Sequence, residues 1–78
     1  MIGIYVILKM DKEVTERIER LYTTNMINMG IKSNILPEVF GKIAAKKIRY
    51  GVTYNKEAED IFAKVTEYIR NDNGKLIP

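Results

Sequence analysis

The first ten residues alternate between strongly apolar positions and positions of mixed character. The strongly apolar set is Ile2, Ile4, Val6, Leu8 and Met10. A two-residue period with many β-branched side chains is typical of a β-strand. The pattern therefore predicts a strand over residues 1–10 with one strongly apolar face.

A helical period follows this run and continues to Gly30. Apolar residues recur there at intervals of three or four positions: Val14, Ile18, Leu21 and Tyr22. Asp11 is a favourable N-cap residue, and glycine is the usual residue just past a helix C-terminus. The sequence predicts a first helix over about residues 11–29.

The stretch from residue 31 to residue 53 fits two interpretations. The signals for a helix are a cap, a proline in the first turn and a terminal glycine: Ser33 or Asn34, Pro37 and Gly51. The alternative is a pair of strands over residues 31–36 and 43–53, in which apolar and polar positions also alternate. Alanine and lysine in "KIAAKK" are strong helix formers and alanine is poor in strands, so the helix is favoured.

The last part of the chain predicts a third helix, from a cap at Asn55 to about residue 71. Its apolar stripe consists of Ala58, Ile61, Phe62, Val65, Tyr68 and Ile69. The final "KLIP" is long enough only for a terminal strand or a tail.

These elements predict a single small domain, residues 1–78, of mixed α/β and mostly helical class. An N-terminal strand is followed by three helices, and its possible partners are the short "KLIP" segment or the same strand of a second copy. Because an exposed apolar strand edge has to be paired, we expect two copies to pair their strands in a homodimer. If the middle stretch is two strands, the alternative is a ferredoxin-like βαββαβ sandwich that pairs the first strand internally.

Composition excludes several classes of function. The chain has no cysteine and no histidine, so disulfides, ordinary zinc sites and a histidine general base are absent, and no cofactor is expected. It contains no glycine-rich phosphate loop or nucleophile elbow, and its paired carboxylates lie among lysines and arginines, as in solvated ion pairs. We therefore expect no enzyme activity.

With no apolar run long enough to span a membrane and no signal-peptide pattern, the prediction is a cytoplasmic protein without a membrane partner.

Charge is unevenly distributed along the chain. Residues 32–56 carry six basic residues and one acidic residue. Within this region four basic residues fall at helical spacing on one broad face: Lys42, Lys46, Lys47 and Arg49. Such a face suits a phosphate backbone and makes these residues candidates for nucleic-acid binding. The tyrosines at 22, 50, 54 and 68 are interpreted instead as core or interface aromatics.

A series of short segments resembles the ribbon-helix-helix DNA-binding family over about residues 2–50. The segments are a strand ending "ILKM", then "DKEVTERIERL", "GIKSN" and "FGKIAAKKI". In that family the paired strands of a dimer enter the DNA major groove, and the second helix begins with a cap that contacts phosphate. The resemblance implies groove-facing Tyr5, Ile7 and Lys9. It also implies a phosphate-contacting cap formed by Lys32, Ser33 and Asn34.

Two functions remain open from the sequence. The first is a small, non-catalytic, DNA-binding regulatory protein that acts as a homodimer and uses its basic helical face. The alternative is a protein-interaction module, such as an inhibitor or adaptor, that docks on a protein partner through an apolar strand edge or helix face.

Overall fold

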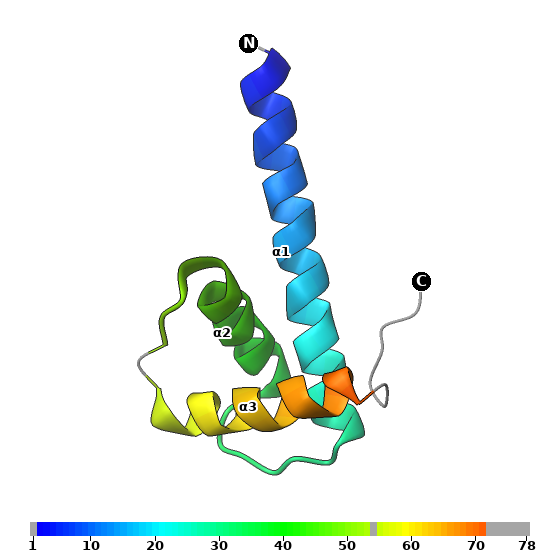
Figure 1. Cartoon of the computed structure of the whole chain (residues 1–78), viewed down its shortest axis with the longest axis vertical. Helices are drawn as coiled ribbons and strands as arrows, with labels where there is room; N and C mark the ends of the chain where they lie inside the picture. The colour runs from blue at the N-terminus through cyan, green and yellow to red at the C-terminus, as the bar shows by residue number, and fades with distance from the viewer. Residues whose placement is uncertain (1, 54, 72–78) are drawn as a thin grey trace.

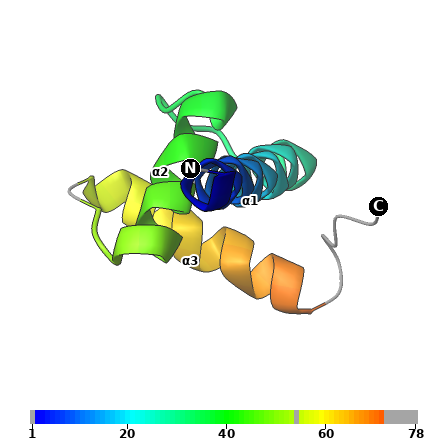
Figure 2. The same ribbon diagram turned by 90° about the horizontal axis from the view of Figure 1, so that it is seen from above.

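Three helices make up the described part of the chain. The computed structural model describes residues 2–53 and 55–71, with the backbone alone for residues 2–10. The helices are α1 (Ile2–Asn28), α2 (Pro37–Tyr50) and α3 (Lys56–Arg70). In Figure 1, α2 lies beside the C-terminal half of α1 and α3 crosses near the end of α1. Figure 2 views α1 nearly end-on and shows α3 running across below it.

The predicted N-terminal strand is wrong, because residues 2–10 form the first turns of α1. Nearly every position of this run is apolar, so a two-residue period and a helical period fit it equally well. A strand needs a partner, whereas extending an existing helix adds one hydrogen bond for each residue that it fixes. Asp11 is accordingly a residue within α1 rather than its N-cap. The predicted pairing of two N-terminal strands in a dimer is therefore also wrong, because residues 2–10 are helical.

The helical interpretation of the middle stretch is confirmed, and the ferredoxin-like alternative is wrong. Residues 37–50 form α2, and no strand occurs in residues 2–53 or 55–71. The predicted cap at Ser33 or Asn34 is also wrong, since Leu36 is the N-cap and makes no side-chain capping bond. The physical reason is Pro37, which disfavours helical geometry in the preceding residue and fixes the backbone for the first helical position.

The remaining helix ends agree with the sequence signals. Gly30 and Gly51 adopt positive φ angles of 66° and 74°, which glycine accepts without steric cost. Gly51 donates its backbone N–H to the Lys47 carbonyl oxygen, at 2.7 Å, and closes α2. Asn55 caps α3, where its Oδ1 accepts from the Ala58 N–H at 3.0 Å. The third helix and its cap are therefore confirmed.

The core lies where the three helices meet, and Tyr22 of α1 joins them. Its ring stacks on Phe62 of α3 with centroids 5.0 Å apart, and it meets Phe40 of α2 at 6.1 Å. Its hydroxyl bonds to the Thr66 hydroxyl at 2.8 Å, so the polar end of this buried side chain is satisfied. Met26 and Val65 are also fully buried there. The packing holds α2 in a fixed orientation, and with it the basic residues that α2 carries.

Candidate nucleic-acid interface

The inner face of α2 consists of Phe40, Gly41, Ala44 and Ala45, all of them buried. Three of these residues are small, so the backbones of α1 and α2 can approach closely. A Cβ atom added at Gly41 would stand 2.5 Å from the carbonyl oxygen of Glu19 in α1. The glycine is therefore required by the approach of α1, and α1 and α2 form the most extensive helix pair in the described chain.

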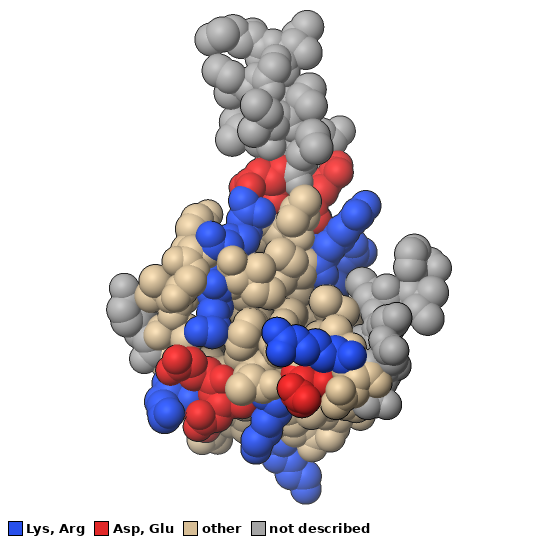
Figure 3. Space-filling model, in the orientation of Figure 1, with Lys and Arg blue, Asp and Glu red and all other residues tan. Residues whose placement is uncertain are grey.

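The outer face of α2 includes Lys42, Lys46 and Tyr50, which are exposed and follow one another at four-residue intervals after the exposed, acidic Glu38. Four residues advance about 6 Å along a helix, so the three side chains form a row along one side of α2. Among the described ion pairs neither lysine has a carboxylate partner. In Figure 3 basic side chains lie over α2 and also over α1 and α3, while acidic ones gather at the upper end of the described α1 side chains and at the start of α3. This row is where a phosphate backbone would meet positive charge.

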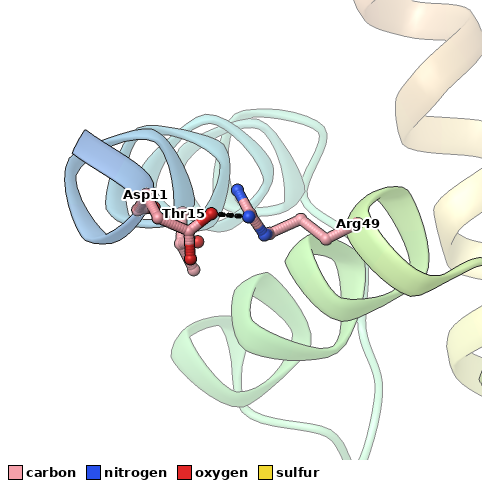
Figure 4. A network of polar contacts seen from close by, with 3 residues as sticks. All are labelled: Asp11, Thr15 and Arg49. Carbon is pink, nitrogen blue, oxygen red and sulfur yellow. Dashed lines mark hydrogen bonds and ion pairs between the residues drawn. The ribbon is translucent and has the colours of Figure 1, made fainter. Parts of the chain in front are cut away.

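Arg49 belongs to the predicted basic set but is already engaged by α1. Its guanidinium forms an ion pair with the Asp11 carboxylate (Figure 4). The Thr15 hydroxyl donates to the Asp11 backbone oxygen at 2.9 Å, in the same turn of α1. Arg49 is only half-exposed, and its Nε is buried with no hydrogen-bond partner among the described atoms. The arginine thus joins the end of α2 to α1, and the Asp11 carboxylate neutralises its charge at the surface.

Lys47 points toward the opposite neighbour. Its Nζ lies 5.4 Å from the centroid of the Phe62 ring in α3, within the range of a cation–π interaction. This lysine is half-buried. Of the four basic residues predicted from helical spacing, the structure therefore directs two outward, Lys42 and Lys46, and uses two to join α2 to the other helices.

The predicted phosphate-contacting cap lies in the loop before α2, at the opposite end of that helix from Tyr50. The Ser33 hydroxyl donates to the Glu57 carboxylate at 2.6 Å and accepts from the Ile35 N–H at 3.0 Å. Lys32 and Asn34 beside it are exposed. The structure does not bring these residues together with Lys46. The predicted groove-facing side chains Tyr5, Ile7 and Lys9 lie outside the described side chains.

Tyr50 is a candidate binding residue that the sequence interpretation missed. The sequence places its ring in the core or an interface, yet 69% of the residue is exposed. The same interpretation is confirmed for Tyr22, which is buried, whereas Tyr68 is half-buried and Tyr54 lies outside the described residues. The signal that identifies Tyr50 is its position eight residues after Lys42, which places it on the lysine row in any helix that continues to Gly51.

Beside Tyr50 is an open cavity of about 520 Å³, here called the Tyr50 cavity. Its lining comes from α2, the following loop and the cap of α3: Ile43, Lys46, Tyr50, Val52, Thr53 and Asn55. The volume falls within the range of small-molecule sites, about 300–1,000 Å³. The cavity combines apolar lining residues with a lysine, an arrangement suited to a flat, partly apolar group attached to an anion.

The described side chains hold no group of three or more histidines, cysteines or carboxylates arranged to bind a metal ion. Nor does any helix in that part of the chain have both the length and the apolar content needed to cross a bilayer. Comparison with protein-family models, curated proteins and solved structures finds no match. The side chains of α2 and the cavity beside it are the features of the described chain that bear on function.

Proposed function

We propose that this chain is a small, non-catalytic nucleic-acid-binding protein that acts through the outer face of α2. The observation that carries the proposal is the row of Lys42 and Lys46, exposed, at four-residue spacing and without a described carboxylate partner. Lysines held in this way neutralise phosphates and release condensed counterions, which provides most of the affinity in sequence-independent binding. A regulatory role through DNA is the form of this proposal that the sequence favours.

The surroundings of the row support the proposal. The carboxylate nearest to α2 among the described ion pairs, Asp11, is paired with Arg49 at the edge of α2 that faces α1. Glu38 occupies the first turn of α2, at the end remote from Tyr50. The row therefore carries positive charge from Lys42 to Tyr50, and Glu38 lies one turn before Lys42 at its N-terminal end.

The experiment is a salt titration of oligonucleotide binding, followed by fluorescence anisotropy, with two matched variants. One variant carries Lys42→Ala and Lys46→Ala on the outer face. The control carries Arg20→Ala on α1 and Lys64→Ala on α3, both exposed, and removes an equal number of positive charges. For every phosphate that the protein no longer neutralises, the slope of log affinity against log salt becomes shallower by about 0.7 for a single strand or 0.9 for a duplex.

We expect the slope of the outer-face variant to be shallower by the amount for roughly two phosphates, and the control to retain the wild-type slope. Equal changes in the two variants would show that net charge alone attracts the nucleic acid. Binding that is independent of salt, or no binding at low salt, would contradict the proposal.

A second candidate, docking on a protein partner, is favoured by the length of α1. Figure 1 shows the first part of α1 extending beyond α2 and α3. Seven of the nine residues at positions 2–10 are apolar in sequence, and apolar helix faces commonly dock in grooves of partners. A partner bound in this way would remain bound at high salt, and it would be released by serine or lysine substitutions within residues 2–10 and not by Lys42→Ala.

A further inference from the structure

The Tyr50 cavity lies at the end of the lysine row, and Tyr50 is the aromatic residue of its described lining. Tyr50 is the last residue of α2, and Gly51, with φ of 74°, turns the chain after it. The described aromatic pairs involve only Tyr22, Phe40 and Phe62, so they leave Tyr50 out of the core stack. A tyrosine that is 69% exposed at the end of a basic row can receive a second flat ring on its own ring.

The polar residues that line the cavity, Lys46, Thr53 and Asn55, offer hydrogen-bond donors. The Asn55 side chain uses its Oδ1 to cap α3, so its amide N–H groups remain as donors. The Thr53 hydroxyl oxygen accepts weakly from the Asn55 backbone N–H at 3.4 Å, and its own proton is available to an acceptor. Lys46 lies on the cavity wall as well as in the row. Donors around an aromatic wall match the acceptor-rich edges of nucleobases and the phosphates attached to them.

We propose that the Tyr50 cavity receives an unpaired base of a single-stranded nucleic acid, which stacks on the Tyr50 ring while the neighbouring phosphates contact Lys46 and Lys42. This inference rests on the proposed function and specifies its ligand. Bases in a duplex already stack on one another, so their faces are not open to a side chain, whereas an exposed aromatic beside a basic row is typical of single-strand binding. Stacking tolerates every base, so little sequence preference is expected.

The row also has dimensions suited to an extended strand. Lys42, Lys46 and Tyr50 are separated by steps of about 6 Å along the helix axis. This step is similar to the distance between successive phosphates in an extended single strand, so consecutive nucleotides can follow consecutive side chains. A strand running from the cavity toward Glu38 would leave the basic row after Lys42, which predicts a binding site of only a few nucleotides.

The test uses three oligonucleotides of one length: a single strand with bases, a single strand of abasic backbone, and a blunt duplex. Affinities of the full chain are measured by anisotropy for wild type, Tyr50→Ala, Tyr50→Phe and Lys42→Ala. Removing the stacking of one base weakens binding roughly 5-fold or more. We expect Tyr50→Ala to cause that loss on the base-bearing single strand and no change on the abasic strand, with Tyr50→Phe retaining wild-type affinity.

Lys42→Ala separates this inference from the proposed function, because it should weaken binding to the base-bearing and abasic strands alike. Equal wild-type affinity for those two strands, preference for the duplex, or an unchanged affinity in Tyr50→Ala would overturn base stacking and leave the basic face intact. Absence of salt-dependent binding to all three oligonucleotides would overturn both. Circular dichroism melting of each variant checks the fold, and we expect the helices to be retained because Lys42 and Tyr50 are exposed.

Discussion

The two faces of α2 belong to one helix but differ in burial and in charge. The inner face buries Phe40 completely and brings the backbone of Gly41 against α1. The outer face exposes two lysines and a tyrosine. The inner face therefore determines where α2 lies, and the outer face determines what α2 presents to a partner. Stability and binding should respond to different substitutions in the same fourteen-residue helix.

The largest effect is expected from Phe40→Ala, which empties the centre of the inner face. Phe40 is 0% exposed and contacts the Tyr22 ring. Truncating a buried phenylalanine to alanine removes about 3–5 kcal/mol of unfolding free energy, which is a large share of the stability of a domain this small. Urea denaturation followed by circular dichroism measures the loss. A loss equal to that of Tyr50→Ala on the outer face would contradict the distinction between the faces.

Gly41→Ala should also destabilise, by about 1–3 kcal/mol through overpacking. The added methyl group would meet the Glu19 carbonyl oxygen, which is backbone and cannot move without shifting α1. Without that neighbour, replacing a helical glycine by alanine stabilises a protein by about 0.4–1 kcal/mol. The sign of the change in midpoint urea concentration therefore decides whether α1 approaches α2 as closely as the structure shows.

The Asp11–Arg49 ion pair lies at the border between the two faces, and its effect should be smaller. Both side chains remain partly exposed, and such pairs contribute about 0.2–1 kcal/mol. A double-mutant cycle with Asp11→Ala and Arg49→Ala should give a coupling energy in that range, and the coupling should fall in high salt. A coupling energy of zero at low salt would show that the pair does not join α1 to α2 in solution.

Substitutions on the outer face should have the smallest effect on stability. Lys42→Ala and Lys46→Ala together are expected to change the unfolding free energy by less than about 0.5 kcal/mol, as for surface positions generally. Thermal melting of this variant beside wild type measures the change. A loss comparable to that of Gly41→Ala would mean that the lysines support the fold and are not reserved for a ligand.

The elements with caps and strong periodicity could be predicted from the sequence. Asn55 and the apolar stripe from Ala58 to Ile69 indicate α3, and Gly51 indicates the end of α2. The N-terminal run could not be predicted from its pattern, because Tyr5 and Ile7 make both alternating sets apolar and leave strand and helix equally compatible. The predicted start of α2 is wrong, since the effect of Pro37 on the preceding residue outweighs the capping preference of Ser33 and Asn34.

The candidate site could be predicted only in part, for a physical reason. Helical spacing correctly groups the basic residues on α2, but spacing within one helix does not show which of them a second helix engages. Arg49 pairs with Asp11, and Lys47 lies over the ring of Phe62. In both cases the partner is distant in sequence. Exposure of Tyr50 likewise depends on the absence of α1 and α3 from that side of α2, which is a property of the packed structure.

The most direct measurement is the salt dependence of single-stranded oligonucleotide binding by wild type and by the Lys42→Ala/Lys46→Ala variant. If the outer face of α2 binds nucleic acid, wild-type affinity falls steeply as salt rises, and the variant shows a slope shallower by roughly 1.4 units, the value for two single-strand phosphate contacts. The Arg20→Ala/Lys64→Ala control keeps the wild-type slope. Identical slopes for all three proteins, or affinity that does not change with salt, would contradict a nucleic-acid interface on α2.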